Sequence, residues 1–438
     1  MSSRIDKITI EKFWGDKTVS FDLEDDINFL IGVNGSGKTT IINLIAATLK
    51  GDYETLARVQ FKSIRIDLLP KKSSSGLTKK AFIEVGKEID ENAPYPQISY
   101  KIKGYNDKET RKYWLNEFEE DYLLRHTITY TAVGHRYKRI TKSDDPTIRD
   151  VNKALQELVN VSWLSIHRVS SGIKLVDDKG YESSIDRKIE ELQIDLVKYF
   201  SQLNRKYAIE TERFQKFIFE SLIEPPNTEV GLGYKQEIDP ENEKDALRHI
   251  FRHFRLDERT TNNKLDKYFD KYDSTLQNMQ SADTITFEDI AYHWGIRKIH
   301  TVVQQWNNVI EKQKQINKTK DTFFQILNSL FQRKALFVND KNELYIETQS
   351  GKHFPLTNLS SGEKQLLIIL GQSLLQEEGV HIYIADEPEL SLHVEWQEKL
   401  VKSLKSLNPN SQIIFATHSP DIVGEYSAFV IKVEDAIR

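Results

Sequence analysis

A glycine-rich turn follows a short apolar run in residues 27–40, which read INFLIGVNGSGKTT. The segment from Gly32 to Thr39 fits the pattern GxxxxGK[ST], in which the backbone N–H groups of a strand-to-helix turn surround phosphate oxygens. The apolar run at 27–31 predicts a buried strand before the turn, and the run at 41–49 predicts a helix after it. Strand, turn and helix in this order predict a phosphate-binding loop, because the helix N-terminus also attracts anions.

The residue types within this loop suit a nucleotide triphosphate with a bound metal. Lys38 is predicted to reach the β- and γ-phosphates, and the Thr39 hydroxyl is predicted to hold Mg²⁺. ATP and Mg²⁺ are therefore the expected ligands. The residues expected to line the phosphates are Gly32, Asn34, Gly35, Ser36, Gly37, Lys38, Thr39 and Thr40.

Two further motifs follow apolar runs near the other end of the chain. The run at 382–385 ends in Asp386 and Glu387, where Asp386 is predicted to bind Mg²⁺ and Glu387 to polarise the attacking water. The run at 412–416 is followed by Thr417 and His418, and the His418 imidazole is predicted to contact the γ-phosphate. Alone, either motif has an ordinary explanation, since acidic pairs often end strands and most single histidines are structural.

A fourth motif, LSSGEKQ at 359–365, opens a predicted helix. Ser361 and Gly362 stand at the helix N-terminus, where free N–H groups can bind an anion. Ser360 and Glu363 have the spacing of a capping box, in which each side chain bonds the other's backbone N–H. The two uses are compatible, because the cap orders the loop that would meet the phosphate.

The order of these four motifs resembles that of ATP-binding-cassette ATPases. The chain looks most similar to their arm-bearing OLD-type and SMC-like members, which include DNA-repair and chromosome-organising heads. The segments DEPELSLH at 386–393 and THSP at 417–420 resemble the OLD-type branch. The fold class implied is α/β: a P-loop ATPase head, with a mixed β-sheet and helices, that carries a long helical or coiled-coil insertion.

This resemblance also implies a dimer that encloses ATP. Each nucleotide would lie between the Lys38, Thr39, Asp386 and Glu387 of one chain and the Ser361 and Gly362 of the other. Ser391 and His393 would belong to the loop that crosses the dimer seam. The family's glutamine loop would fall near 167–168, where the chain has His-Arg instead, so that role stays open.

The chain is predicted to have three segments: an N-terminal ATPase lobe at 1–182, a helical arm at 183–333 and a C-terminal ATPase lobe at 334–438. The arm is predicted because apolar residues recur at spacings of four and three on both its flanks. In the second of these two heptad patterns, polar residues occupy two of the positions at which an apolar residue is expected, Gln313 and Lys320. Two explanations stay open, an antiparallel hairpin or two ordinary core helices. The seam residues are Ile185, Ile189, Leu192, Leu196, Tyr199 and Leu203, then Val302, Trp306, Val309, Ile316, Phe323, Leu327 and Leu330.

Composition excludes several classes of protein. The 438 residues contain no cysteine, which excludes a disulfide scaffold, a thiolate zinc site and a cysteine nucleophile. Lys plus Arg is 61 and Asp plus Glu is 66, so the net charge of −5 argues against a surface devoted wholly to nucleic acid. No apolar run approaches 18 residues and no signal peptide opens the chain, so no membrane association and a cytoplasmic location are expected.

The resemblance suggests two functions. Because the sequence runs for 20 residues beyond His418, we expect no Toprim nuclease domain of the kind that OLD-type nucleases carry. An ATPase without its own nuclease resembles the sensor subunits of two-gene anti-phage systems. PARIS, with a separate Toprim-type effector, fits best, and Septu, with an HNH nuclease, fits next. The alternative is an SMC-like repair or maintenance ATPase that binds DNA, with the predicted basic helix face as one candidate contact. This face comprises Arg248, Arg252, Arg255 and Arg259.

Overall fold

The computed structural model describes residues 3–70, 80–88, 96–115, 146–164, 184–223, 238–281 and 286–438. The chain divides into two compact units. The head comprises Met1–Val197 and Thr322–Arg438, and the helical unit comprises Lys198–Asp321. The lobe boundaries at 182 and 333 stay a prediction. The dipeptide at 167–168, where the glutamine loop was expected, lies outside the described residues.

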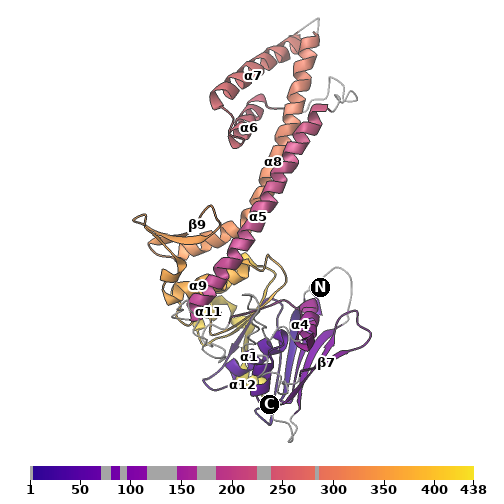
Figure 1. The fold of residues 1–438 in the computed structure, drawn as a ribbon, viewed down its shortest axis with the longest axis vertical. Helices are drawn as coiled ribbons and strands as arrows, with labels where there is room; N and C mark the ends of the chain where they lie inside the picture. Colours follow the sequence, from indigo (N-terminus) through magenta and orange to yellow (C-terminus); the bar gives the residue numbers. More distant parts are fainter. Residues whose placement is uncertain are drawn as a thin grey trace, which may run out of the picture. The chain divides into compact units, whose positions relative to one another are not determined.

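A five-stranded parallel sheet forms the centre of the head (Figure 1). Its three inner strands are largely apolar and buried, as expected for a parallel sheet covered on both faces, whereas its two edge strands are mostly only partly buried. The order is β14-β3-β13-β12-β8, and all four neighbouring pairs are parallel. The strands are β3 (Ile27–Ile31), β8 (Val161–Leu164), β12 (Ile382–Asp386), β13 (Gln412–Ala416) and β14 (Val430–Lys432).

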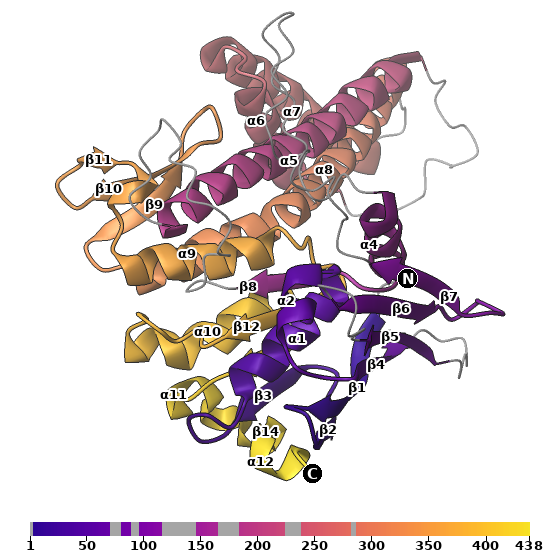
Figure 2. The same ribbon diagram turned by 60° about the horizontal axis from the view of Figure 1, so that its bottom comes forward.

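A six-stranded antiparallel sheet is the second layer of the head. Its strands alternate buried and partly exposed residues, which is the pattern of a sheet with one face on the core. Helix α1 (Lys38–Lys50) contacts strands of both sheets, and their apolar residues form one core around it (Figure 2). The order is β2-β1-β4-β5-β6-β7, with β1 (Ser3–Phe13), β2 (Lys17–Asp22), β4 (Ser63–Pro70), β5 (Ala81–Glu88), β6 (Gln97–Lys103) and β7 (Arg111–Leu115).

Two of the predicted motifs lie at the N-terminal ends of helices in the head. Helix α9 (Ser361–Leu374) carries the 359–365 motif, and α10 (Val394–Leu407) follows the 386–393 segment. A third sheet of order β11-β10-β9 precedes α9. These observations confirm the predicted α/β head. The other elements are α2 (Tyr53–Arg58), α4 (Pro146–Leu158), β9 (Lys334–Val338), β10 (Leu344–Thr348), β11 (His353–Phe354), η2 (Leu356–Asn358), α11 (Pro420–Val423), η3 (Gly424–Phe429) and α12 (Val433–Ala436).

The helical unit contains most of two long helices, α5 (Ser184–Ile223) and α8 (Phe287–Leu330). They run antiparallel and side by side (Figure 1). The buried Gln313 side chain donates a hydrogen bond to Thr211 Oγ1 (3.1 Å), and Lys320 Nζ lies 5.1 Å from the Phe200 ring centroid. The two polar positions of the second seam therefore pair with α5, and of the two open explanations the structure shows the antiparallel hairpin.

Two shorter helices, α6 (Pro240–His253) and α7 (Glu258–Ser281), complete this unit. Leu247 and Ile250 of α6 are buried in its aromatic core. The predicted basic face is partly neutralised, because Arg248 pairs with Asp245 (2.8 Å) and Asp266 (3.0 Å). Arg252 likewise pairs with Glu258 at 3.0 Å. The prediction of one helix face with four arginines is wrong, because α6 ends at His253, Arg255 has φ of 54° and Arg259 lies in α7. The two arginines that α6 does carry, Arg248 and Arg252, both pair with acidic neighbours.

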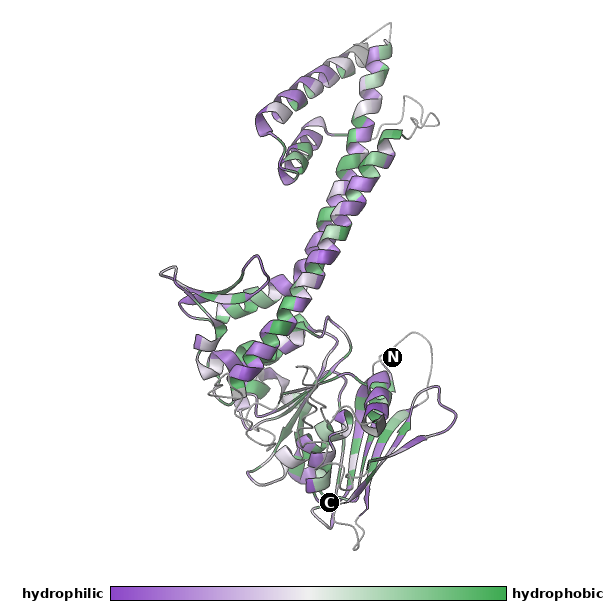
Figure 3. Cartoon of the chain, viewed as in Figure 1, coloured by the Kyte–Doolittle hydropathy of each residue, from purple (hydrophilic) through white to green (hydrophobic). Residues whose placement is uncertain are grey.

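Hydropathy differs between the elements of the structure (Figure 3). Helix α7 is largely hydrophilic, whereas the strands of the parallel sheet are hydrophobic. No described helix combines the length and the apolar character that crossing a membrane requires.

Candidate functional site

Three parallel strands end together at one edge of the central sheet. Asp386, the last residue of β12, pairs with Ala416 of β13, and Ala416 pairs with Leu30 of β3. The residues that follow these strands are therefore neighbours: the phosphate loop, the acidic pair and the Thr417–His418 loop. Carboxyl ends of parallel strands are where such sheets usually bind ligands. Pairing in register thus brings together segments that are more than 340 residues apart in sequence.

The phosphate loop closes around the Lys38 ammonium. Lys38 is buried, and its Nζ donates hydrogen bonds to the carbonyl oxygens of Gly32 (2.8 Å) and Val33 (3.0 Å). Gly37 precedes α1 with φ of 99°, and a Cβ there would lie 2.9 Å from the Trp14 ring. Backbone conformation and contact with Trp14 both require glycine at this position.

The loop fits a phosphate chain with Mg²⁺. Gly35 has φ of 84°, and a Cβ there would meet nothing within 4 Å, so the loop is open on that side. The buried Ser36 Oγ has no hydrogen-bond partner among the described residues, which leaves a donor for a phosphate oxygen. Thr39 Oγ1 donates to Asp386 Oδ1 (3.2 Å), which pairs the two predicted metal ligands. Mg²⁺ commonly takes one or two protein oxygens and completes its shell with phosphates and water.

Beside this pair lie the two residues predicted to act on water and phosphate. His418 Nε2 is 3.6 Å from Glu387 Oε1. Glu387 has φ of 47°, a left-handed conformation rare for this residue type, and its N–H bonds to Ala416 O (2.8 Å). Such strained backbone concentrates at functional sites, where the surrounding structure holds it in place. The turn aims the Glu387 carboxylate away from the strand axis and toward His418.

The 359–365 motif folds as the predicted capping box. Ser360 Oγ accepts the Glu363 N–H (3.4 Å), and Glu363 Oε2 accepts the Ser360 N–H (2.9 Å). Ser361, exposed, is the first residue of α9. A Cβ on Gly362 would lie only 2.3 Å from the Ser391 carbonyl oxygen, so glycine is needed for this approach. The start of α9 thereby contacts the 391–393 segment within one chain.

The remaining predicted site residues lie on turns or in the first turn of a helix. Asn34 is exposed in the phosphate loop, and Thr40 is half-buried in the first turn of α1. Ser391 is exposed with φ of 71°, and His393 is the exposed N-cap residue of α10 without a side-chain capping bond. Ser391 and His393 are thus accessible to a second molecule.

Glu363 also forms an ion pair with Lys334 of β9 (2.8 Å). Burial disfavours the ionised carboxylate, but the hydrogen bonds from Lys334 and Ser360 outweigh burial and lower the pKa of Glu363. A lowered pKa adds stability that is complete above the carboxyl's ordinary value of 4.5 and is lost as pH falls through the lowered value.

Glu363→Gln should therefore reduce the free energy of unfolding of the head by about 1–3 kcal/mol at pH 7, the usual contribution of hydrogen bonds to charged groups. The deficit should shrink as the pH falls below 4.5 and through the lowered pKa of Glu363, because the parent carboxylate then loses its charge. Chemical unfolding of both chains across this range measures the effect. If the loss in unfolding free energy did not depend on pH, the shape of the Glu363 side chain, and not its charge, would account for it.

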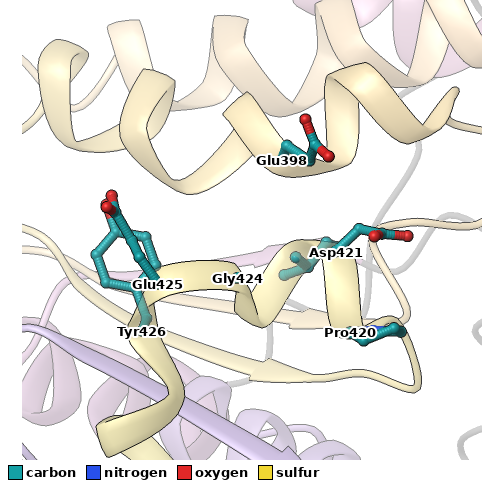
Figure 4. A pocket seen from close by; sticks show the side chains of 7 residues that line it. Glu398, Pro420, Asp421, Gly424, Glu425 and Tyr426 are labelled. Carbon is teal, nitrogen blue, oxygen red and sulfur yellow. The ribbon is translucent and has the colours of Figure 1, made fainter.

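A separate depression lies next to the Thr417–His418 loop (Figure 4). It has a volume of about 280 Å³ and is lined by three carboxylates, those of Glu398, Asp421 and Glu425. Figure 4 shows Glu398 on α10 facing Asp421 across the gap. Three negative charges repel phosphate, so this depression is not the nucleotide site.

Three residues at the site were missed by sequence reasoning. Glu434 of α12 accepts the Val33 N–H (2.7 Å), and this bond lowers the pKa of Glu434. Trp14 lies against Gly37, as described above. Glu389 is buried beside the Thr417–His418 loop. Only Glu389 gave a sequence signal, a third carboxylate two residues after Glu387, whereas Trp14 and Glu434 are distant from the motifs in the chain.

Comparison with known proteins identifies related sequences. A family model described as AAA ATPase domain matches residues 4–423. The retron Vc95 probable ATPase of Vibrio cholerae serotype O1 biovar El Tor is 23% identical over 444 residues, which cover 94% of this chain and 69% of that protein. The Septu protein PtuA of Bacillus thuringiensis is 29% identical over 130 residues, or 27% of this chain and 32% of that protein.

Further similarities involve a DNA-repair ATPase and a solved Smc head domain. The DNA double-strand break repair Rad50 ATPase of Sulfurisphaera tokodaii is 30% identical over 132 residues, or 27% of this chain and 15% of that protein. Among solved structures, the Smc head domain of Pyrococcus furiosus bound to the C-terminal domain of ScpA gives a TM-score of 0.39 at 14% identity. That alignment covers 96% of this chain and 91% of the other.

Proposed function

The chain belongs to the AAA ATPase domain family and is an ATPase, and on this premise we propose that it dimerises around ATP to control a separate toxic effector in anti-phage defence. The observation that carries the catalytic part is the convergence of five side chains at one sheet edge. These are Lys38, Thr39, Asp386, Glu387 and His418.

The roles within the chain follow from this geometry. Lys38 would exchange its bonds to the Gly32 and Val33 carbonyls for phosphate oxygens, which are stronger acceptors because they are charged. Thr39 and Asp386 would hold Mg²⁺, which, when bound, neutralises phosphate charge. Glu387 would orient and polarise the attacking water, and His418, next to it, would contact the γ-phosphate.

A second copy of the chain would complete the site. The N-terminus of α9 presents the exposed Ser361 and, through its dipole, attracts anions. Ser391 and His393 are exposed beside it and would meet the other chain. ATP would then join two heads, and hydrolysis would release them.

The role in defence rests on the relatives. Two of them carry the names of bacterial systems, the retron Vc95 probable ATPase and the Septu protein PtuA. A nuclease of the Toprim or HNH type is the proposed effector, as the resemblance to PARIS and Septu ATPases implies. The assignment to PARIS itself stays a prediction.

A DNA-repair or maintenance ATPase is the second candidate, because the Rad50 ATPase is among the relatives. This function requires DNA affinity that falls with salt concentration and rises with ATP. The ion pairs of Arg248 and Arg252 make the face of α6 a weaker candidate for that contact. Effector control requires a protein partner and does not require DNA affinity.

Native mass spectrometry distinguishes the two functions. Glu387→Gln, expressed with its neighbouring genes and purified with ATP, should carry a second protein at fixed stoichiometry. Lys38→Ala, which we expect not to form the ATP dimer, should give a complex of different mass under the same conditions. A chain that carries nucleic acid and no second protein would overturn effector control in favour of the DNA-binding function.

A further inference from the structure

Glu389 is a buried carboxylate that holds the loop carrying His418. Its Oε1 accepts three hydrogen bonds: from the Thr417 hydroxyl (2.6 Å), the His418 N–H (2.9 Å) and the Ser419 N–H (3.3 Å). The side chain is only 8% exposed. Consecutive donors from the loop thus converge on one oxygen, and that oxygen belongs to the segment that also supplies Asp386 and Glu387.

The other carboxylate oxygen lacks such compensation. Glu389 Oε2 is buried and has no hydrogen-bond partner among the described residues. Burying a charge with one oxygen unsatisfied is costly, and a neutral acceptor would satisfy the same donors at a lower cost. The three hydrogen bonds from the 417–419 loop are therefore what offsets the burial of this carboxylate.

A second set of hydrogen bonds to this loop runs through Gln397. The Ser419 hydroxyl donates to Gln397 Oε1 (2.6 Å), and Gln397 Nε2 donates to the Leu392 carbonyl (2.9 Å). Leu392 lies between Ser391 and His393, the exposed residues of the proposed dimer contact. The loop that carries His418 is therefore bonded both to the acidic segment and to the segment that would meet a second chain.

We propose that Glu389 is a positioning residue for ATP hydrolysis, which fixes the 417–419 loop so that the His418 imidazole stays beside the Glu387 carboxylate. The inference rests on the proposed role of His418. Glu389 acts through the loop backbone and does not touch the reacting atoms. A displacement of about 1 Å in a positioning group can lower the rate 100-fold. Loss of the hydrogen bonds between Glu389 and the 417–419 loop should therefore lower kcat and leave the affinity for ATP nearly unchanged.

Two measurements on Glu389→Ala test the proposal. Hydrogen exchange of the 417–419 amides should accelerate by roughly 10-fold or more, most of all at His418. The His418 N–H loses its acceptor, whereas the Ser419 N–H keeps its bond to Thr417 Oγ1 (3.0 Å). The kcat should fall by roughly 10- to 100-fold, and this fall should disappear when His418→Ala is already present, because both changes remove the same interaction. Glu389→Gln, which keeps an acceptor oxygen, should recover most of the rate.

A matched control is Glu243→Ala, which removes a carboxylate of similar burial from α6 in the helical unit. It should destabilise the chain without changing kcat or exchange at 417–419. If Glu389→Ala does not fold, Thr417→Val removes one of the three donors at nearly constant volume and should show smaller effects in the same direction.

The outcomes separate this inference from the proposed function. Unchanged exchange at 417–419, or a loss of rate that adds fully to that of His418→Ala, would overturn the positioning role of Glu389. A His418→Ala chain with parental kcat would overturn it too, and would leave ATPase activity and effector control standing. Failure of the parent to assemble with an effector would overturn the proposed function alone, because exchange and the paired substitutions need no partner.

Discussion

Glu387→Gln is expected to bind ATP with near-parental affinity and to hydrolyse it about 10²–10⁴-fold more slowly, the usual contribution of a positioned general base. The amide keeps the shape of the side chain, and its carbonyl can still accept a hydrogen bond from water. It cannot polarise that water as a carboxylate does. Single-turnover hydrolysis measures the loss separately from nucleotide release.

The same substitution should trap the proposed dimer. ATP that is bound and not hydrolysed would keep two heads joined, so size-exclusion chromatography with light scattering should show a dimer with ATP and a smaller species with ADP. Glu398→Gln is the matched control, because it neutralises a carboxylate that lines the depression in Figure 4 and not the phosphate loop. Parental turnover in Glu387→Gln would show that another group activates the water.

The central sheet could be predicted because its signals are local. The strands at 27–31, 382–386 and 412–416 are short, largely apolar runs, and each leads directly into one of the predicted site motifs. An apolar run of this length is typical of a strand buried on both faces. The order of the strands in the sheet was not predicted, since each crossover spans tens to hundreds of residues. Pairing of Asp386 with Ala416 then placed the acidic pair beside His418.

The supporting residues could not be predicted, because their contacts depend on tertiary structure. Glu434 bonds to Val33 of the phosphate loop across 401 residues, and no local pattern marks Glu434. For Glu389, the sequence shows a carboxylate near the acidic pair but does not show its hydrogen bonds to the 417–419 loop. The heptad seams predicted two long helices, yet contacts between them, such as the bond between Gln313 and Thr211, were needed to distinguish a hairpin from separate core helices.

Lys38→Ala should abolish ATP binding at millimolar nucleotide, a loss of roughly 100-fold or more. Removing one partner of a buried, hydrogen-bonded charge pair costs about 2–5 kcal/mol, which corresponds to such a factor. In the parent, the ammonium also bridges the Gly32 and Val33 carbonyls, so the substitution leaves the phosphate loop less ordered. Isothermal titration with ATP and Mg²⁺ measures the loss directly.

Thermal unfolding gives an independent measure, because a ligand that binds only the folded state raises the melting temperature. ATP should stabilise the parent and leave Lys38→Ala unchanged. Lys50→Ala is the matched control, since it removes an ammonium from the last turn of α1, the helix that begins with Lys38. That chain should still be stabilised by ATP. If Lys38→Ala were stabilised as strongly as the parent, the nucleotide would bind elsewhere, and the convergence of Thr39, Asp386 and Glu387 would need another explanation.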